Sequence, residues 1–119
     1  MALNLFDSGG TPVAYSDDGM LLYLFSGEPV GYMEKGSVYS YSGRHIGFFE
    51  NGWIMDNCGY AVLFSENAKG GPIRPIRGIL PIKGIKGILP IKGIQEIKPL
   101  KPIRQIGWSD ISINLFFSQ

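Results

Sequence analysis

The sequence contains little of the chemistry on which most catalytic and metal sites depend. Its 119 residues include one cysteine, Cys58, and one histidine, His45. A single cysteine excludes an internal disulfide framework, and these two residues are too few for a Cys/His zinc site. The sequence also contains no phosphate-binding loop, dinucleotide fingerprint or nucleophile elbow. We therefore expect a protein that is not an enzyme and that holds neither a cofactor nor a metal.

Long apolar runs are missing as well. No stretch approaches the roughly 20 apolar residues that a membrane-spanning helix needs, and the N-terminus carries no charged-then-apolar leader. We therefore expect no membrane partner. The single cysteine constrains the redox compartment only weakly and favours the cytoplasm. A hydrophobic content of 45% and an aromatic content of 13% indicate a folded chain, and the length predicts one domain over residues 1–119.

The formal net charge of +1 hides two oppositely charged halves. Residues 1–68 contain eight acidic and two basic residues, whereas residues 69–119 contain nine basic and two acidic ones. Opposite charges of similar size attract within one small domain. We therefore expect the two halves to face each other.

Residues 1–71 contain four similar segments. They begin at Gly10, Gly27, Gly43 and Gly59 and read GTPVAYSDDG, GEPVGYMEKG, GRHIGFFENG and GYAVLFSENA. Each segment opens on glycine and continues with Val or Ile, an aromatic residue, and Asp or Glu. An internal repeat fixes the architecture, and we interpret each unit as a β-hairpin. The strands are apolar on both faces, which predicts that both faces are covered.

Three of the units have a two-residue turn of the kind that needs positive φ at its centre. These turns are Asp18-Gly19, Lys35-Gly36 and Asn51-Gly52. The strand residues that they would place opposite each other are Tyr15 with Leu22, Tyr32 with Tyr39, and Phe48 with Met55.

The fourth unit departs from the pattern, because Ala68 stands where the other units have their closing glycine. Its hairpin is either incomplete or completed from elsewhere in the chain. Two segments are available for this role: Leu3 and Leu5 alternate near the N-terminus, and residues 108–119 alternate near the C-terminus. We predict that residues 108–119 form a closing strand, and that pairing of the two segments closes the ring.

Residues 72–107, which we call the collar, consist of twelve triplets. They read PIR PIR GIL, PIK GIK GIL, PIK GIQ EIK and PLK PIR QIG, which is four nonapeptides that begin at Pro72, Pro81, Pro90 and Pro99. A period of three fits neither a helix nor a strand, but it fits polyproline II. We predict one nonapeptide per hairpin, with the Ile and Leu edge against the hairpins and the Lys and Arg side chains outside or reaching the hairpin carboxylates. An exposed apolar stripe is an aggregation liability, so the triplets should be buried against this chain or a partner.

The two repeats together resemble a known family. Four GxPVxYxExG-like units followed by P-I-K/R triplets are similar to the 4-fold β-flower, a family of small prokaryotic domains, over nearly the whole chain. The resemblance implies a pseudo-fourfold arrangement of β-hairpins. It implies no activity and no catalytic residues. The fold class that we predict is therefore all-β and pseudo-fourfold, with an extended triplet collar and a C-terminal strand.

Four equivalent carboxylates, one in each unit, are the first candidate site. They are Asp17, Glu34, Glu50 and Glu66. Four such groups could converge on an axis and bind a hard cation. Hairpin geometry favours the alternative, in which they lie at hairpin tips and pair with the basic collar or with water.

The basic collar is the second candidate. Its exposed residues could form an interaction surface made of Lys83, Lys86, Lys92, Lys98, Lys101 and Arg104, together with Trp53, which we expect near the surface because it follows a turn directly. A basic stripe can bind nucleic acid or another polyanion. No aromatic residue interrupts the triplets to stack on bases, and the acidic half offers an internal partner, so a structural role is favoured.

The single histidine and the single cysteine are interpreted as structural residues. His45 occupies the position that Pro12 and Pro29 hold in other units, which predicts an exposed or half-buried strand residue. Cys58 has no matched ligand, which predicts a buried thiol. The function that we expect is a non-enzymatic structural or protein-interaction module whose partner the sequence does not identify, with self-association open and binding of a polyanion as the alternative.

Overall fold

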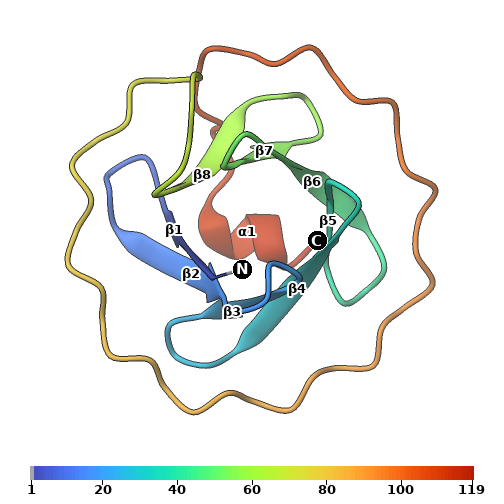
Figure 1. Ribbon diagram of the computed structural model, residues 1–119. Helices are drawn as coiled ribbons and strands as arrows, with labels where there is room; N and C mark the ends of the chain where they lie inside the picture. The colour runs from blue at the N-terminus through green and yellow to red at the C-terminus, as the bar shows by residue number, and fades with distance from the viewer. Residues whose placement is uncertain (1) are drawn as a thin grey trace.

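Eight short strands form one closed antiparallel barrel in the computed structural model, which describes residues 2–119 (Figure 1). The strands follow one another around the barrel in chain order. They are β1 (Leu3–Phe6), β2 (Pro12–Ser16), β3 (Leu21–Leu24), β4 (Pro29–Glu34), β5 (Ser37–Tyr39), β6 (His45–Glu50), β7 (Trp53–Asp56) and β8 (Ala61–Ser65). The collar runs around the outside of the barrel without helix or strand, and a short helix, α1 (Ile113–Phe117), lies within the ring of strands (Figure 1).

The turns set the register of two hairpins as predicted. Positive φ angles occur at Lys35 and Gly36 and again at Asn51 and Gly52. The pairings of Tyr32 with Tyr39 and of Phe48 with Met55 are confirmed. The tight turns therefore specify which side chains lie opposite each other in these hairpins.

The register predicted for the first hairpin is wrong by one residue. Tyr15 lies opposite Tyr23 and not Leu22. The Asp18 carboxylate accepts hydrogen bonds from the backbone N–H groups of Met20 and Leu21, at 2.8 and 2.9 Å. These bonds stabilise a turn that is one residue longer than a type I′ turn.

The fourth unit is completed from the N-terminus. Strand β1 pairs with β2 on one side and with β8 on the other, where Leu5 lies opposite Ser65 and Phe6 lies opposite Phe64. This pairing closes the barrel, so the N-terminal segment completes the fourth unit, as one of the two predicted candidates. The predicted pairing of this segment with residues 108–119 is wrong.

The closing strand predicted for residues 108–119 is wrong. Trp108 makes one isolated bridge to Ala61, and the chain then forms α1, whose first turn is capped by the Ser112 side chain. A closed barrel has no free edge to which another strand can add. Ile113, Phe116 and Phe117 have helical spacing, and this spacing places them toward the barrel core. No helix among residues 2–119 is long and apolar enough to cross a membrane.

Both faces of the barrel wall are covered, as the apolar strands predict. The inner face packs around the buried Phe116 of α1, and the outer face is lined with aromatic rings. The small residues Gly31 and Gly47 lie where the backbone of the next strand approaches closely. A Cβ atom at Gly47 would lie 2.1 Å from the carbonyl oxygen of Met55. Glycine is therefore required there.

Candidate functional site

The collar is attached to the barrel with a period of nine residues. The four loops that precede β2, β4, β6 and β8 each present a glycine carbonyl to a backbone N–H of the collar, at 2.8–3.0 Å. The pairs are Gly10 with Gly78, Gly27 with Gly87, Gly43 with Glu96, and Gly59 with Gln105. The loop glycines are 16 or 17 residues apart, whereas their partners in the collar are nine apart. One nonapeptide therefore lies on each hairpin unit, which confirms that part of the prediction.

The loop glycines leave no room for a side chain. Gly27 and Gly43 have φ angles of +99° and +95°. A Cβ atom at either residue would lie 2.0 Å from a carbonyl oxygen of the collar, that of Ile85 or Ile94 respectively. The glycine that opens each repeat therefore serves the contact with the collar, in addition to the conformation of the loop.

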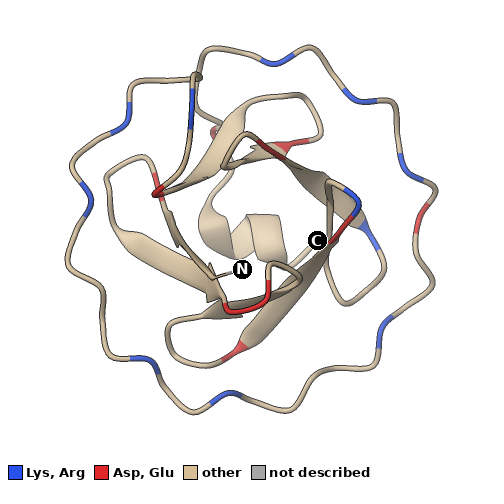
Figure 2. Cartoon of the chain, viewed as in Figure 1, with Lys and Arg blue, Asp and Glu red and all other residues tan. Residues whose placement is uncertain are grey.

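Figure 2 shows the basic residues spaced along the collar around the barrel. Their side chains reach the aromatic outer face of the barrel. The Nζ atom of Lys83 lies 4.3 Å from the ring centroid of Tyr15, and that of Lys92 lies 4.2 Å from the centroid of Tyr32. The Nζ atom of Lys86 likewise lies 4.9 Å from the ring centroid of Tyr23. Such contacts are worth about 0.5–1 kcal/mol each at exposed sites. The two oppositely charged halves therefore face each other, as predicted.

Two of the repeat carboxylates pair with collar lysines. The carboxylate of Asp17 accepts a hydrogen bond of 2.6 Å from Lys86 and lies 3.7 Å from Lys83. The hydrogen bond from Lys86 lowers the pKa of Asp17 below its ordinary value. Glu50 forms an ion pair with Lys101. The side chains of these pairs are exposed to solvent, which screens their attraction, so each pair adds little to stability.

The other two carboxylates have neutral partners. Glu34 accepts a hydrogen bond of 3.1 Å from the side chain of Gln95, and Glu66 accepts bonds of 2.9 and 2.7 Å from the backbone and side chain of Asn4. Burial raises the pKa of Glu66, but the bonds from Asn4 outweigh this effect and lower it. Among residues 2–119, no three His, Cys, Asp or Glu side chains are placed to hold a metal ion. The four carboxylates thus act separately, and three of them hold the collar.

The apolar edge of the collar faces the opposite way to the prediction. The middle residue of every triplet points away from the barrel and is 84–96% exposed. We call these twelve residues the rim: Ile73, Ile76, Ile79, Ile82, Ile85, Ile88, Ile91, Ile94, Ile97, Leu100, Ile103 and Ile106.

The direction of the rim follows from the three edges of a period-three chain. The residues in the first position that are not proline donate backbone hydrogen bonds to carbonyls of the loops. Most basic residues in the third position contact rings, carboxylates or carbonyls of the barrel. The barrel thus occupies two edges, and the third, which carries the Ile and Leu side chains, is left to face outward.

Trp53 is not on the surface. Its side chain is fully buried, and its indole N–H donates a hydrogen bond of 3.1 Å to the carbonyl of Lys69. The guanidinium carbons of Arg74 and Arg104 lie 5.9 and 6.0 Å from the centroid of its ring, and Trp108 packs edge-on at 5.5 Å. Trp53 therefore binds the two ends of the collar, and it is not part of an interaction surface.

The degrees of exposure predicted for the single cysteine and the single histidine are also wrong, although His45 lies in a strand, β6, as predicted. Cys58 is exposed in the loop before β8. His45 is buried against the ring of Phe48, at a centroid distance of 4.6 Å. Its Nδ1 lies 2.8 Å from Oδ1 of Asn57, whose amide donates to the carbonyl of His45 at 2.7 Å. This pairing places the imidazole proton on Nδ1.

The buried imidazole makes stability depend on pH. Burial lowers the pKa of His45 below its ordinary 6.5, Lys98 lowers it further, and the hydrogen bond to Asn57 and the charge of Glu96 oppose the shift. Just below pH 6.5, the unfolded chain therefore binds a proton at His45 more readily than the folded chain does. The free energy of unfolding is therefore expected to be highest above pH 6.5 and to fall below it, by at most about 1.4 kcal/mol per pH unit.

Urea unfolding at pH 7.5 and 5.5 measures this effect. The wild type should lose stability between the two values, whereas His45→Gln, which removes the only histidine, should lose much less. An equal loss in the two proteins would show that carboxylates, and not His45, cause the dependence.

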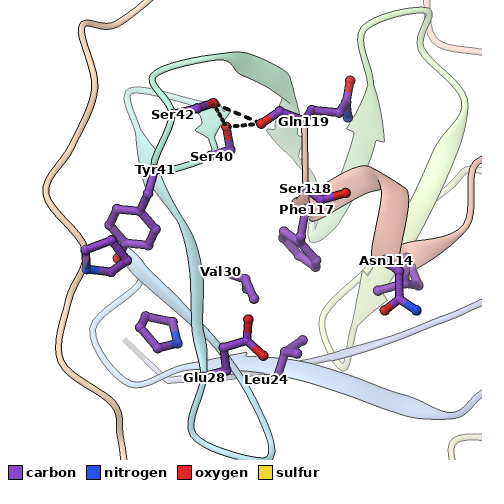
Figure 3. Close-up of a pocket in the computed structure, with 13 residues that line it drawn as sticks. Leu24, Glu28, Val30, Ser40, Tyr41, Ser42, Asn114, Phe117, Ser118 and Gln119 are labelled. Carbon is purple, nitrogen blue, oxygen red and sulfur yellow. Dashed lines mark hydrogen bonds between the residues drawn. The ribbon is translucent and has the colours of Figure 1, made fainter.

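A cleft of about 380 Å³ lies between the β3–β4 loop, the β5–β6 loop and the end of α1 (Figure 3). On one side the hydroxyls of Ser40 and Ser42 donate hydrogen bonds of 2.8 and 2.9 Å to the carbonyl of Gln119. On the other side Glu28 is the charged residue of the lining, next to the apolar Leu24. The lining combines hydroxyl, amide and carboxylate groups with apolar side chains, and it could hold a small polar molecule.

The comparison with protein families agrees with this architecture. No curated protein and no solved structure matches the chain. Residues 3–117 match the family described as 4-fold beta flower protein. The match extends from the first strand of the barrel to the end of α1, and the chain therefore belongs to the 4-fold beta flower family.

Proposed function

We propose that this chain is a non-enzymatic protein-interaction module that binds its partner through the rim. The observation that carries the proposal is the exposure of twelve branched apolar side chains on one continuous line. A patch of this kind marks an interaction surface on a folded protein. Burying one Ile or Leu side chain supplies about 1.5–3 kcal/mol, so a partner must cover several neighbouring rim residues to offset the cost of association.

The way the collar is held supports the same function. Backbone hydrogen bonds fix each nonapeptide at a loop glycine, and cation–ring contacts fix the side chains between. The rim is thus ordered before a partner arrives, which lowers the entropic cost of binding. The alternative function, binding of a polyanion, has less support because Lys83, Lys86 and Lys101 direct their charges to carboxylates of the barrel.

Photo-crosslinking at single positions tests the proposal. A photoreactive amino acid replaces Ile88 on the rim or, as a matched control, Leu115, which is also apolar and 63% exposed but lies on α1. In the cells that naturally produce the protein, irradiation should give discrete products from position 88 and not from position 115. The same products from both positions, or none from position 88, would contradict an interaction through the rim.

A further inference from the structure

We propose that the partner of the rim is a second copy of this chain, and that the molecules associate edge to edge. This inference rests on the proposed function and specifies its partner. The molecule is a disc of 36 × 36 × 25 Å, and the collar follows its whole circumference (Figure 1). We call the part of the rim that one nonapeptide carries a sector. A globular partner that touches one sector of such a disc leaves the other three sectors exposed.

The four sectors of the rim are equivalent, and this equivalence favours identical neighbours. Each nonapeptide is held at the same place by the same glycine contact, so each presents its three apolar side chains in the same way. A surface that fits one sector therefore fits the other three. A second copy carries such surfaces in equal number, and the contact between two like sectors is self-complementary.

The spacing of the rim residues permits two rims to interlock. Successive rim residues are three positions apart, which corresponds to about 9 Å along an extended chain with 3.1 Å of rise per residue. Between them lie small or ring residues such as Gly84 and Pro90, and basic residues such as Lys83 that reach toward the barrel. Each gap can thus admit one branched side chain from the opposite rim.

The collar is basic, but its charges oppose the contact only weakly, because the basic side chains reach toward the barrel. The rim itself carries no charged side chain, and the formal net charge of the molecule is only +1. Repulsion between copies is weak at so small a net charge, and low net charge promotes association. The collar lysines that pair with Asp17 and Glu50 neutralise the nearest acidic groups of their own chain.

The size of one contact determines the kind of assembly. Two convex edges can bring together only about one sector each, which is less than the roughly 800 Å² per partner of a stable interface. A single contact is therefore weak, and an isolated pair is not the expected product. Four equivalent sectors allow each disc up to four neighbours, so the expected product is a flat array that forms cooperatively as concentration rises.

Sedimentation velocity over a concentration series tests this inference on the full chain. The wild type should sediment as the 13.1 kDa monomer at low micromolar concentration and as larger species toward millimolar concentration. A rim variant with one serine in each nonapeptide (Ile79→Ser, Ile88→Ser, Ile97→Ser and Ile106→Ser) should remain monomeric. The matched control, Met20→Ser with Leu115→Ser, removes exposed apolar side chains away from the rim and should associate like the wild type.

Two further readings check the nature of the assembly. Near-ultraviolet circular dichroism of Trp53 and Trp108 should be unchanged in the rim variant, because the four replaced side chains are exposed and their loss should leave the barrel folded. Sulfate should strengthen the association, as it does for apolar contacts. Electron microscopy of the associated wild type should show flat arrays with a repeat slightly above 36 Å.

A wild type that stays monomeric at every concentration would overturn the inference, as would amorphous aggregates or a control variant that fails to associate. The crosslinks from position 88 then separate the two proposals. A crosslinked product that contains another protein, from a chain that is monomeric alone, leaves the rim as an interaction surface and excludes the second copy. Absence of any product from position 88 overturns both.

Discussion

Replacing Gly43 by alanine is expected to lower the free energy of unfolding by about 3 kcal/mol, since a positive-φ position costs about 1 kcal/mol and overpacking a further 1–3 kcal/mol. The added Cβ atom would lie 2.0 Å from the carbonyl oxygen of Ile94, which is backbone and cannot move aside alone. The third nonapeptide must therefore separate from its loop. Urea unfolding measures the loss of stability, and limited trypsin digestion should show faster cleavage after Lys92, which is followed by Gly93.

Gly36→Ala is the matched control. Gly36 also has positive φ, at +79°, but a Cβ atom there would meet only the carbonyl of Phe49, at an ordinary contact distance of 3.7 Å. This variant should lose about 1 kcal/mol, which is the cost of the backbone conformation, and its collar should resist trypsin like that of the wild type. Equal losses in the two variants would show that the loop contact does not hold the collar.

The second large effect concerns the helix inside the barrel. Phe116→Ala is expected to cost about 3–5 kcal/mol, because the ring is fully buried and its removal leaves a cavity among the inner strand residues. The neighbouring variant Leu115→Ala removes a largely exposed side chain and should change stability by less than about 0.5 kcal/mol. Chemical denaturation of the two variants side by side measures the difference. Similar small losses would contradict the placement of α1 within the barrel.

The parts of the fold that depend on local backbone chemistry could be predicted from the sequence. Lys35-Gly36 and Asn51-Gly52 specify their turns because few residues tolerate positive φ at two successive positions. The sequence contains four loop glycines and four nonapeptides. These equal numbers predict that each nonapeptide contacts one loop glycine, as the backbone hydrogen bonds show. Asp18 shows the limit, since its side-chain hydrogen bonds lengthen a turn that its Asp-Gly dipeptide predicts to be short.

The direction of the rim could not be predicted in the same way. A period of three places all the Ile and Leu side chains on one edge, but it does not specify which edge meets the barrel. The contacts of Lys83 with Tyr15 and of Lys86 with Asp17 decide this, and both join residues almost 70 positions apart. The sequence did contain a signal for this direction, because basic side chains in the third position of the triplets are attracted to aromatic rings, and the strands are rich in such rings.

The burial of Trp53 and the helical conformation of α1 could not be predicted, because residues distant in the chain determine their surroundings. Trp53 follows a turn, and its cover comes from Arg104 and Trp108. The segment with α1 contains both an alternating and a helical pattern of apolar residues, and only the closure of the barrel by β1 removes the edge on which a strand could form.

The position of β1 next to β8 has a consequence for the order of folding. Leu5 pairs with Ser65, so the first strand of the barrel must wait for the last strand of the barrel to be synthesised before its second edge is paired. Bringing Leu5 and Ser65 together closes a loop of about 60 residues, and the entropic cost of this closure is not offset by the local turns that form first. The hairpins can form one by one during synthesis, but the ring closes only after β8 is complete, and the collar can wrap only around a closed ring.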